Sequence, residues 1–290
     1  MPAARFRVGE FDLAVVSDGY MRLDAGAAMG IIPRVMWEPV LGPGALDAEH
    51  RLKLALNCTI LRRGDEITLI DTGMGNKHDR RVRERMFPGD YGYLLGELSE
   101  LDISPEDVTC VVNTHLHTDH CGWNTVVRGE LLEPTFPRAR YCVQSQEFES
   151  AMAPNERTRG TYFAENFEPL RGTGRLELVE GEGPISPGLH FLPAPGHTRH
   201  HAAVVIRSGR ETAIHSGDLV HHQVQLERLA WIPAFDEAPL DSLETKRRLL
   251  GRAVAESALL ISPHIEFPGT GRVVEEGRRR RFVPETPEAP

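Results

Sequence analysis

The sequence predicts a mixed α and β fold in which two β-sheets pack against each other and helices cover their outer faces. Three observations support this prediction. With 290 residues the chain can bury a large core. Its composition, 40% hydrophobic and 26% charged, is that of a globular protein. Short β-branched segments outnumber helical segments and alternate with them in both halves of the chain.

The first half contains apolar segments of strand length, several of them closed by Gly, Asp or Asn. These predicted strands are residues 11–19, 54–63, 66–73 and 108–115. Before the last of them, Leu94, Leu95, Leu98 and Leu101 have helical spacing, which predicts a helix.

The second half repeats this alternation of strands and helices. The predicted strands are residues 139–144, 176–181, 189–197, 202–209, 211–218 and 259–264. A short helix is expected at 145–152, and a long helix from about Asp241, where Asp241 and Glu244 suggest a capping box.

We expect residues 1–290 to form a single domain, since neither a fixed repeat nor a low-complexity linker divides the chain. Residues 1–50 would supply an N-terminal strand and a segment that either covers the active site as a lid or forms a homodimer interface. Residues 277–290, which include arginines at 278–281, are expected to form a flexible tail with a solvated terminal strand.

The net charge excludes some classes of partner, and the spacing of the cysteines indicates their redox state. A formal net charge of -9 disfavours nucleic acid and anionic membranes, because both reward a basic surface. No apolar segment reaches the about 20 residues of a membrane span, and acids interrupt the N-terminal apolar stretch, so we predict a cytoplasmic protein. The four cysteines are far apart, which favours reduced thiols over a disulfide framework.

The segment "NTHLHTDHCGWN", residues 113–124, carries the clearest chemical signal. His115 and His117 point to the same side of an extended segment, and a following turn can bring Asp119 and His120 beside them. Imidazole nitrogens and carboxylate oxygens are ligands of Zn²⁺, and a catalytic site needs only three from the protein. This spacing therefore predicts one metal site and part of a second.

Further ligand types follow predicted strands elsewhere in the chain. His197 comes after the strand residues 189–195, Asp218 after 211–215 and His264 after 259–261, and Asp71 follows an earlier strand. Strand ends are where loops place active-site residues on a rigid scaffold. We expect these side chains to complete the site.

In chain order, the candidate ligands resemble the five motifs of the metallo-β-lactamase superfamily. They are Asp71, the motif at residues 115–120, His197, Asp218 and His264. The resemblance implies a four-layer αββα sandwich of two mixed β-sheets and a dinuclear metal centre with two Zn²⁺ per chain. Mn²⁺, Co²⁺ or Fe²⁺ are alternatives for the same ligands. By this resemblance Asp218 would bridge the ions and Asp71 would orient ligands without touching them. The first ion would be held by His115, His117 and His197, and the second by Asp119, His120 and His264.

The aspartate at position 218 separates branches of the superfamily. The commonest β-lactamases carry cysteine at this position, whereas lactonases, phosphotriesterases, glyoxalase II and nucleases carry aspartate. The acidic charge disfavours a nuclease, and the chain has no separate helical domain of the glyoxalase II kind. Segments such as "DHCGWNT" and "GDLVHHQVQL" are similar to methyl parathion hydrolase and quorum-quenching lactonase-like members.

The resemblance implies a hydrolase that cleaves a neutral small-molecule ester, a lactone or a carboxylic ester, with hydroxide held between two metal ions. Phosphotriester hydrolysis is the alternative within this class. A non-catalytic metal-binding or sensing protein, or a redox module with iron in the same ligands, is the alternative from another class.

Three side chains are expected to take part in catalysis, and two of them are also predicted metal ligands. Asp119 or Asp218 would relay the proton of the attacking water to the leaving oxygen. His221, three residues after Asp218, would contact the substrate or its leaving group. An apolar wall for the substrate is predicted from Trp123, Trp231 and Phe235. His200, His201 and His222 have weaker claims to a functional role, which the sequence leaves open.

Overall fold

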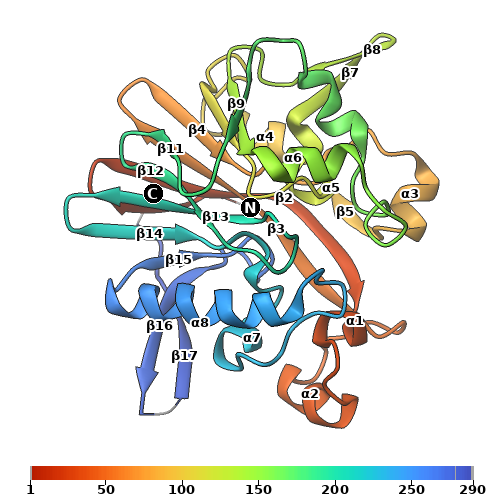
Figure 1. The fold of residues 1–290 in the computed structure, drawn as a ribbon, viewed down its shortest axis with the longest axis vertical. Helices are drawn as coiled ribbons and strands as arrows, with labels where there is room; N and C mark the ends of the chain where they lie inside the picture. Colours follow the sequence, from red (N-terminus) through yellow and green to blue (C-terminus); the bar gives the residue numbers. More distant parts are fainter. Residues whose placement is uncertain (1, 278, 289–290) are drawn as a thin grey trace.

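A computed structural model describes residues 2–277 and 279–288 and has the predicted layered architecture (Figure 1). In the first sheet the strands lie side by side in the order β1-β2-β3-β4-β6-β9-β10, and β5 pairs with β2. These strands are β1 Ala4–Val8, β2 Phe11–Asp24, β3 Arg51–Arg63, β4 Glu66–Ile70, β5 Gly89–Tyr91, β6 Cys110–Val112, β9 Arg140–Gln144 and β10 Leu176–Val179.

The second sheet follows the chain in the order β11-β12-β13-β14-β15-β16-β17. Most of its neighbours are antiparallel, but β14 and β15 are parallel, as are β4 and β6 in the first sheet. Its strands are β11 Pro184–Ser186, β12 Leu189–Pro193, β13 Ala202–Ser208, β14 Glu211–His215, β15 Leu259–Ile261, β16 Thr270–Glu276 and β17 Arg279–Pro284. A separate hairpin joins β7 Thr125–Arg128 to β8 Leu131–Pro134.

Helices connect and cover the strands. The α-helices are α1 Ala25–Met29, α2 Arg34–Leu41, α3 Arg80–Arg85, α4 Leu94–Ser99, α5 Thr118–Cys121, α6 Ser145–Met152, α7 Val224–Glu227 and α8 Pro239–Ala255. Short 3-10 helices are η1 Gly122–Asn124, η2 Ala164–Asn166, η3 Glu168–Leu170 and η4 Gly217–Leu219. Figure 1 shows α4 and α6 beside the first sheet and α8 alongside the second.

Alternation along single strands builds the layers, because successive side chains of a strand point to opposite faces. In β2, Val15 belongs to the core between the two sheets, whereas Val16 packs with α4. In β13, Val204 belongs to the same central core, whereas Val205 packs with α8. The αββα sandwich is therefore confirmed. The shared central core also supports our proposal that residues 1–290 form one domain.

Two local predictions were wrong. The predicted flexible tail contains the ordered strand β17, because Phe282 is buried against β16 and Arg280 pairs with Glu275 at 2.8 Å. Residues 278, 289 and 290 of that tail lie outside the described residues. Helix α8 begins at Pro239, not at an Asp241 capping box, since the fixed φ of proline suits the first helical position.

Candidate site residues follow the carboxyl ends of the parallel strands. Asp71 follows β4, His115 follows β6, Asp218 follows β14 and His264 follows β15. Parallel neighbours end at the same edge of a sheet, so these residues gather at one edge of the sandwich. In the described part of the chain, no helix combines the length and the apolar character that crossing a membrane requires.

Candidate metal centre

The seven predicted ligands converge in two groups at this edge. One group is His115, His117 and His197, and the other is Asp119, His120, Asp218 and His264. Within each group the candidate ligand atoms all lie within 4.8 Å of one another. All of these side chains are buried except that of Asp119, which is partly exposed. The structure thus brings together every residue that the sequence proposed as a ligand.

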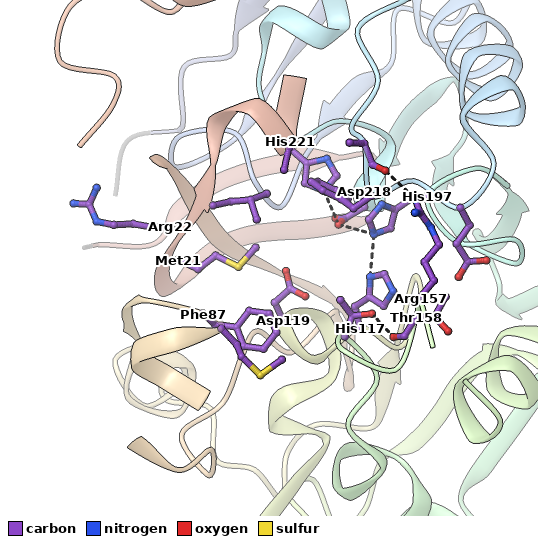
Figure 2. Close-up of a pocket in the computed structure, with 17 residues that line it drawn as sticks. Met21, Arg22, Phe87, His117, Asp119, Arg157, Thr158, His197, Asp218 and His221 are labelled. Atoms are coloured by element: carbon purple, nitrogen blue, oxygen red, sulfur yellow. Dashed lines mark hydrogen bonds and ion pairs between the residues drawn. The ribbon is translucent and has the colours of Figure 1, made fainter. Parts of the chain in front are cut away.

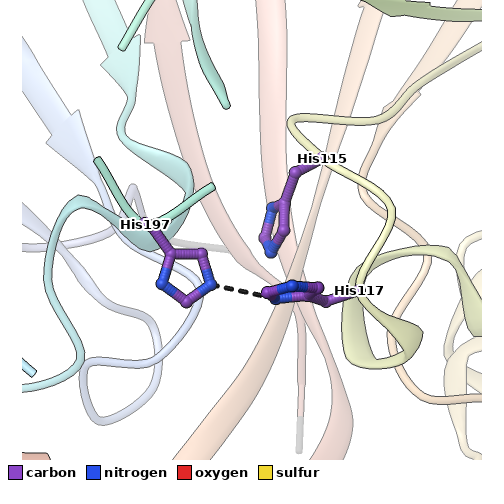
Figure 3. Close-up of side chains that lie close together, drawn as sticks. All are labelled: His115, His117 and His197. Atoms are coloured by element: carbon purple, nitrogen blue, oxygen red, sulfur yellow. Dashed lines mark hydrogen bonds between the residues drawn. The ribbon is translucent and has the colours of Figure 1, made fainter. Parts of the chain in front are cut away.

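The three-histidine group joins the two sheets. His115 and His117 leave β6 of the first sheet, and His197 follows β12 of the second. Nδ1 of His117 lies 3.0 Å from Nε2 of His197, and Figure 3 shows the three rings turned toward one point. Nε2 of His115 is buried without a hydrogen-bond partner among the described residues. An orphaned imidazole nitrogen at this point fits a metal ligand, because a buried polar atom otherwise needs a partner.

Asp218 lies between the two groups and points one carboxylate oxygen to each. Its Oδ1 is 3.0 Å from Nε2 of His120 and 3.1 Å from Nε2 of His264. Its Oδ2 is 3.2 Å from Nε2 of His197 and 3.0 Å from Nε2 of His221. This is the placement that a bridging carboxylate requires.

Asp71 contacts the loop that carries the histidines. Its φ of 54° is unusual for a residue other than glycine and aims the carboxylate at the loop that follows β6. One oxygen accepts from the backbone N–H of Thr114 at 2.8 Å, and the other lies 2.9 Å from Nδ1 of His120. A carboxylate on the far nitrogen of a histidine fixes the ring so that Nε2 remains free for an ion.

The ligands shift one another's pKa in both directions. Burial opposes protonation of His120, His197 and His264, but neighbouring carboxylates, above all Asp218, raise the pKa of all three, so these rings must release a proton to bind an ion. Burial alone would raise the pKa of Asp218, but the surrounding imidazoles, first of all His120, hold it well below its ordinary value. Burial and the neighbouring imidazoles lower the pKa of His115 and of His117 well below the ordinary value. Asp218 is therefore ionised and these two rings are neutral at neutral pH, the forms that bind metal.

Sequence reasoning missed two side chains that hold the ligands. Oδ1 of buried Asp236 lies 3.0 Å from Nδ1 of His197. Nε2 of His201 accepts from the backbone N–H of Asp218 at 2.9 Å, which gives His201 a positioning contact. Asp236 lies far from His197 in the sequence and in no motif, so the chain offered no signal for it.

A sequence model of the metallo-beta-lactamase superfamily matches residues 53–264, which include every ligand proposed above. The chain belongs to the metallo-beta-lactamase superfamily.

Relatives agree with this membership. A probable metallo-hydrolase of Mycobacterium tuberculosis is 27% identical over 239 residues, covering 71% of this chain and 70% of that protein. An N-acyl homoserine lactonase of Bacillus cereus is 27% identical over 180 residues; the match covers 58% of this chain and 62%, less than two thirds, of the lactonase. The chain is thus placed among the metallo-hydrolases of the superfamily, with lactonase relatives.

Solved structures share the fold over almost the whole chain. A probable metal-dependent hydrolase from Staphylococcus aureus superposes with a TM-score of 0.85 at 22% identity, covering 98% of this chain and 100% of that one. AidC, described as a dizinc quorum-quenching lactonase in complex with a product, superposes with a TM-score of 0.84 at 21% identity, covering 99% of each chain. These likenesses establish the metallo-β-lactamase fold.

A cavity of about 370 Å³ opens onto the candidate metal ligands of this superfamily member. Figure 2 shows Met21 and Phe87 on one side, and Arg157 and Thr158 on the other. Other lining side chains include Leu23, Ala27, Met86, Ala234, Phe235 and Glu237. The cavity thus has a mostly apolar wall, a polar wall and the candidate metal ligands between them.

Of the three residues predicted to form an apolar wall, Phe235 lines the cavity and the two tryptophans do not. Trp123 is buried in the core against α4, where its Nε1 donates to Asp18 at 2.8 Å. Trp231 is buried with residues of the N-terminal segment. Trp123 follows the ligand motif closely in the sequence, but packing turns both rings toward the interior.

Part of the N-terminal segment lines the cavity, and part faces solvent. Met21, Leu23 and Ala27 lie on the cavity wall, which suits the predicted covering role. On and beside α2 the exposed large apolar side chains are Ile31, Val35, Met36 and Val40. A homodimer interface at this position stays a prediction.

Lys246 bonds the loop that carries Phe235. Its burial makes the free energy of unfolding depend on pH. Its Nζ is buried and donates to the carbonyl of Trp231 at 2.9 Å. Burial lowers the pKa of Lys246 from 10.5 to about 7, which nearby Asp236 offsets only in part. Between about pH 7 and 10.5 the unfolded chain binds a proton that the folded chain does not, so the free energy of unfolding rises with pH.

We expect Lys246→Met to remove this contribution, which is at most about 1.4 kcal/mol per pH unit. Urea unfolding of both proteins at several values between pH 7 and 10 measures it. Equal slopes of unfolding free energy against pH in the two proteins would contradict the prediction.

Proposed function

We propose that the protein is a dinuclear-metal hydrolase that cleaves a neutral ester, foremost a lactone or a carboxylic ester. One observation carries the proposal: seven ligand side chains form two groups, and Asp218 directs one oxygen to each. A single-ion or purely structural site would not need this double arrangement. The lactonase relatives support the choice of a lactone as the first substrate to test.

The proposed ligands are His115, His117 and His197 for one ion and Asp119, His120 and His264 for the other, with Asp218 shared. Zn²⁺ is the ion proposed, because mixed histidine and carboxylate ligands suit it, with Mn²⁺, Co²⁺ or Fe²⁺ as alternatives. When bound, two such ions lower the pKa of water held between them and polarise the ester oxygen. A serine or cysteine nucleophile is then not required.

The side chains of this chain would handle the proton and orient the substrate. Asp119 is partly exposed at the cavity floor, and Oδ2 lies 3.4 Å from Nε2 of His264. We assign proton relay to Asp119 or Asp218, since both carboxylates border the cavity that would admit the ester. Apolar Met21, Leu23 and Phe87 would contact the uncharged part of the substrate.

His221 is proposed to contact the substrate carbonyl or the leaving group. Its ring lines the cavity, stacks on His264 with an interplanar angle of 13°, and meets Phe235 edge-on at 4.9 Å. Burial lowers the pKa of His221, so the ring is neutral at neutral pH. Its Nε2–H donates to Asp218, and Nδ1, which has no partner among the described residues, is free to accept a hydrogen bond from the substrate or its leaving group.

We expect His221→Phe, which keeps a ring but no nitrogen, to lower kcat about 100-fold while KM and metal content change little. Steady-state kinetics with metal analysis test this, with His200→Phe as the control, because His200 is only half-buried and does not line the cavity. Unchanged kcat in His221→Phe would dismiss the role.

The proposed reaction is tested with Zn²⁺-loaded protein and a panel of lactones, aryl esters and neutral phosphotriesters. We expect lactone or carboxylic ester turnover that a chelator abolishes and added Zn²⁺ restores. Turnover of phosphotriesters alone would favour the phosphotriesterase alternative. Absence of turnover with two bound ions would favour a non-catalytic metal-binding or sensing protein. A cytoplasmic location stays a prediction.

A further inference from the structure

The buried carboxylate of Glu147, in helix α6, connects the segments that carry His117 and His197. Its side chain has no exposed surface. Oε1 accepts from the backbone N–H of Leu116 at 3.1 Å and from the hydroxyl of Tyr162 at 2.9 Å. Oε2 accepts from the hydroxyl of Thr198 at 2.7 Å. A carboxylate buried this completely requires such donors, so the three bonds fix the positions of their owners.

Each partner of Glu147 adjoins a proposed ligand. Leu116 lies between His115 and His117, and Thr198 directly follows His197. The ring of Tyr162 lies 4.8 Å from the ring of His117, tilted by 59°. One side chain therefore restrains ligand segments that come from both sheets of the sandwich.

His117 depends on this contact more than the other ligands do. Nδ1 of His197 has Asp236, Nδ1 of His120 has Asp71, and Nδ1 of His264 lies 2.8 Å from the carbonyl of Ala55. No hydrogen bond reaches Nε2 of His117 from residues 2–277 or 279–288. Its orientation is set by the adjacent backbone and by the Tyr162 ring, and Glu147 holds both.

We propose that Glu147 is the positioning residue of the three-histidine site. Its carboxylate, through Leu116, Tyr162 and Thr198, holds His117 and His197 at the separation that a shared ion requires. The inference rests on the proposed metal centre and adds a residue that touches neither ion nor substrate.

The variant Glu147→Gln tests this role. An amide keeps the size of the side chain but loses the charge that strengthens the three bonds, and its NH₂ group cannot accept from Thr198, whose hydroxyl must then turn from donor to acceptor. We expect the affinity for one of the two Zn²⁺ ions to fall about 10- to 100-fold while the other is unchanged, as for lost ligand-orienting contacts elsewhere. Competition with a chelator measures the affinities, and absorption bands of the Co²⁺-loaded protein report the three-histidine geometry.

Glu149→Gln is the matched control, since Glu149 lies on the same helix with an exposed side chain. It should retain both ions and the wild-type cobalt spectrum. Tyr162→Phe provides a second variant that keeps the ring on His117 but loses the bond to Glu147, and a smaller loss of affinity in the same site is expected. This variant decides the question if Glu147→Gln does not fold.

If Glu147→Gln has wild-type zinc affinities and a wild-type cobalt spectrum, Glu147 does not have this role, but the proposed metal centre is unaffected. The same result in Tyr162→Phe decides the question when only that variant folds. Failure of the wild-type protein and of Glu149→Gln to bind two ions would instead overturn the metal centre itself, and this inference with it.

Discussion

Replacement of Asp218 by asparagine is expected to lower kcat/KM for the ester substrate about a thousand-fold or more. This corresponds to a loss of roughly 4 kcal/mol of transition-state stabilisation, because the two metal ions that Asp218 would bridge stabilise the transition state together. Asparagine keeps the shape of the side chain but offers one oxygen and no charge. The two ions would then lose their common ligand. Kinetics and metal analysis of the purified variant measure the effect.

Asp241→Asn is the control for this substitution, since Asp241 lies exposed in the first turn of α8. It should retain wild-type turnover. Wild-type kcat/KM in Asp218→Asn would contradict both the bridging position and the proposed chemistry.

Replacement of Asp18 by alanine is expected to lower the free energy of unfolding by about 3 kcal/mol. This fully buried carboxylate accepts from the backbone N–H groups of Met74, Gly75 and Leu94 and from Nε1 of Trp123. Alanine would leave these donors without a partner. Burial raises the pKa of Asp18 to about 6, so relief from burying the charge offsets part of the loss.

Urea denaturation measures this change, with Asp12→Ala as the control on the same strand. Asp12 is exposed and pairs with Arg7 at 3.4 Å, a contact of about 0–1 kcal/mol. Equal midpoints for the two variants would show that water or repacking satisfies the donors around position 18.

Local sequence patterns predicted the parts of the site that depend on neighbours in the chain. The spacing of His115, His117 and His120 is set by one strand end and one turn, so their convergence followed from strand geometry. Partners at strand ends extended that prediction to Asp218 and His264, because parallel strands finish at one edge.

Contacts between segments that are distant in the chain could not be predicted from local sequence patterns. Glu147 has the appearance of an ordinary acid in an amphipathic helix, and only the packing of α6 on the loops after β6 and β12 buries it. Trp123 was misplaced for the same reason, since its direction is decided by Asp18, a residue 105 positions away. The ordered pairing of β17 with β16 was not predicted, because it is this pairing and not the arginine-rich composition that stabilises the strand.

The origin of the ligands in both sheets makes the ions, when bound, a cross-link between the two halves of the sandwich. His117 belongs to one half and His197 to the other, and their facing nitrogens are 3.0 Å apart. Ion binding would therefore hold the two sheets together at the edge where the ligands lie. The resistance of the protein to heat and to proteolysis would then increase with the free zinc concentration by mass action.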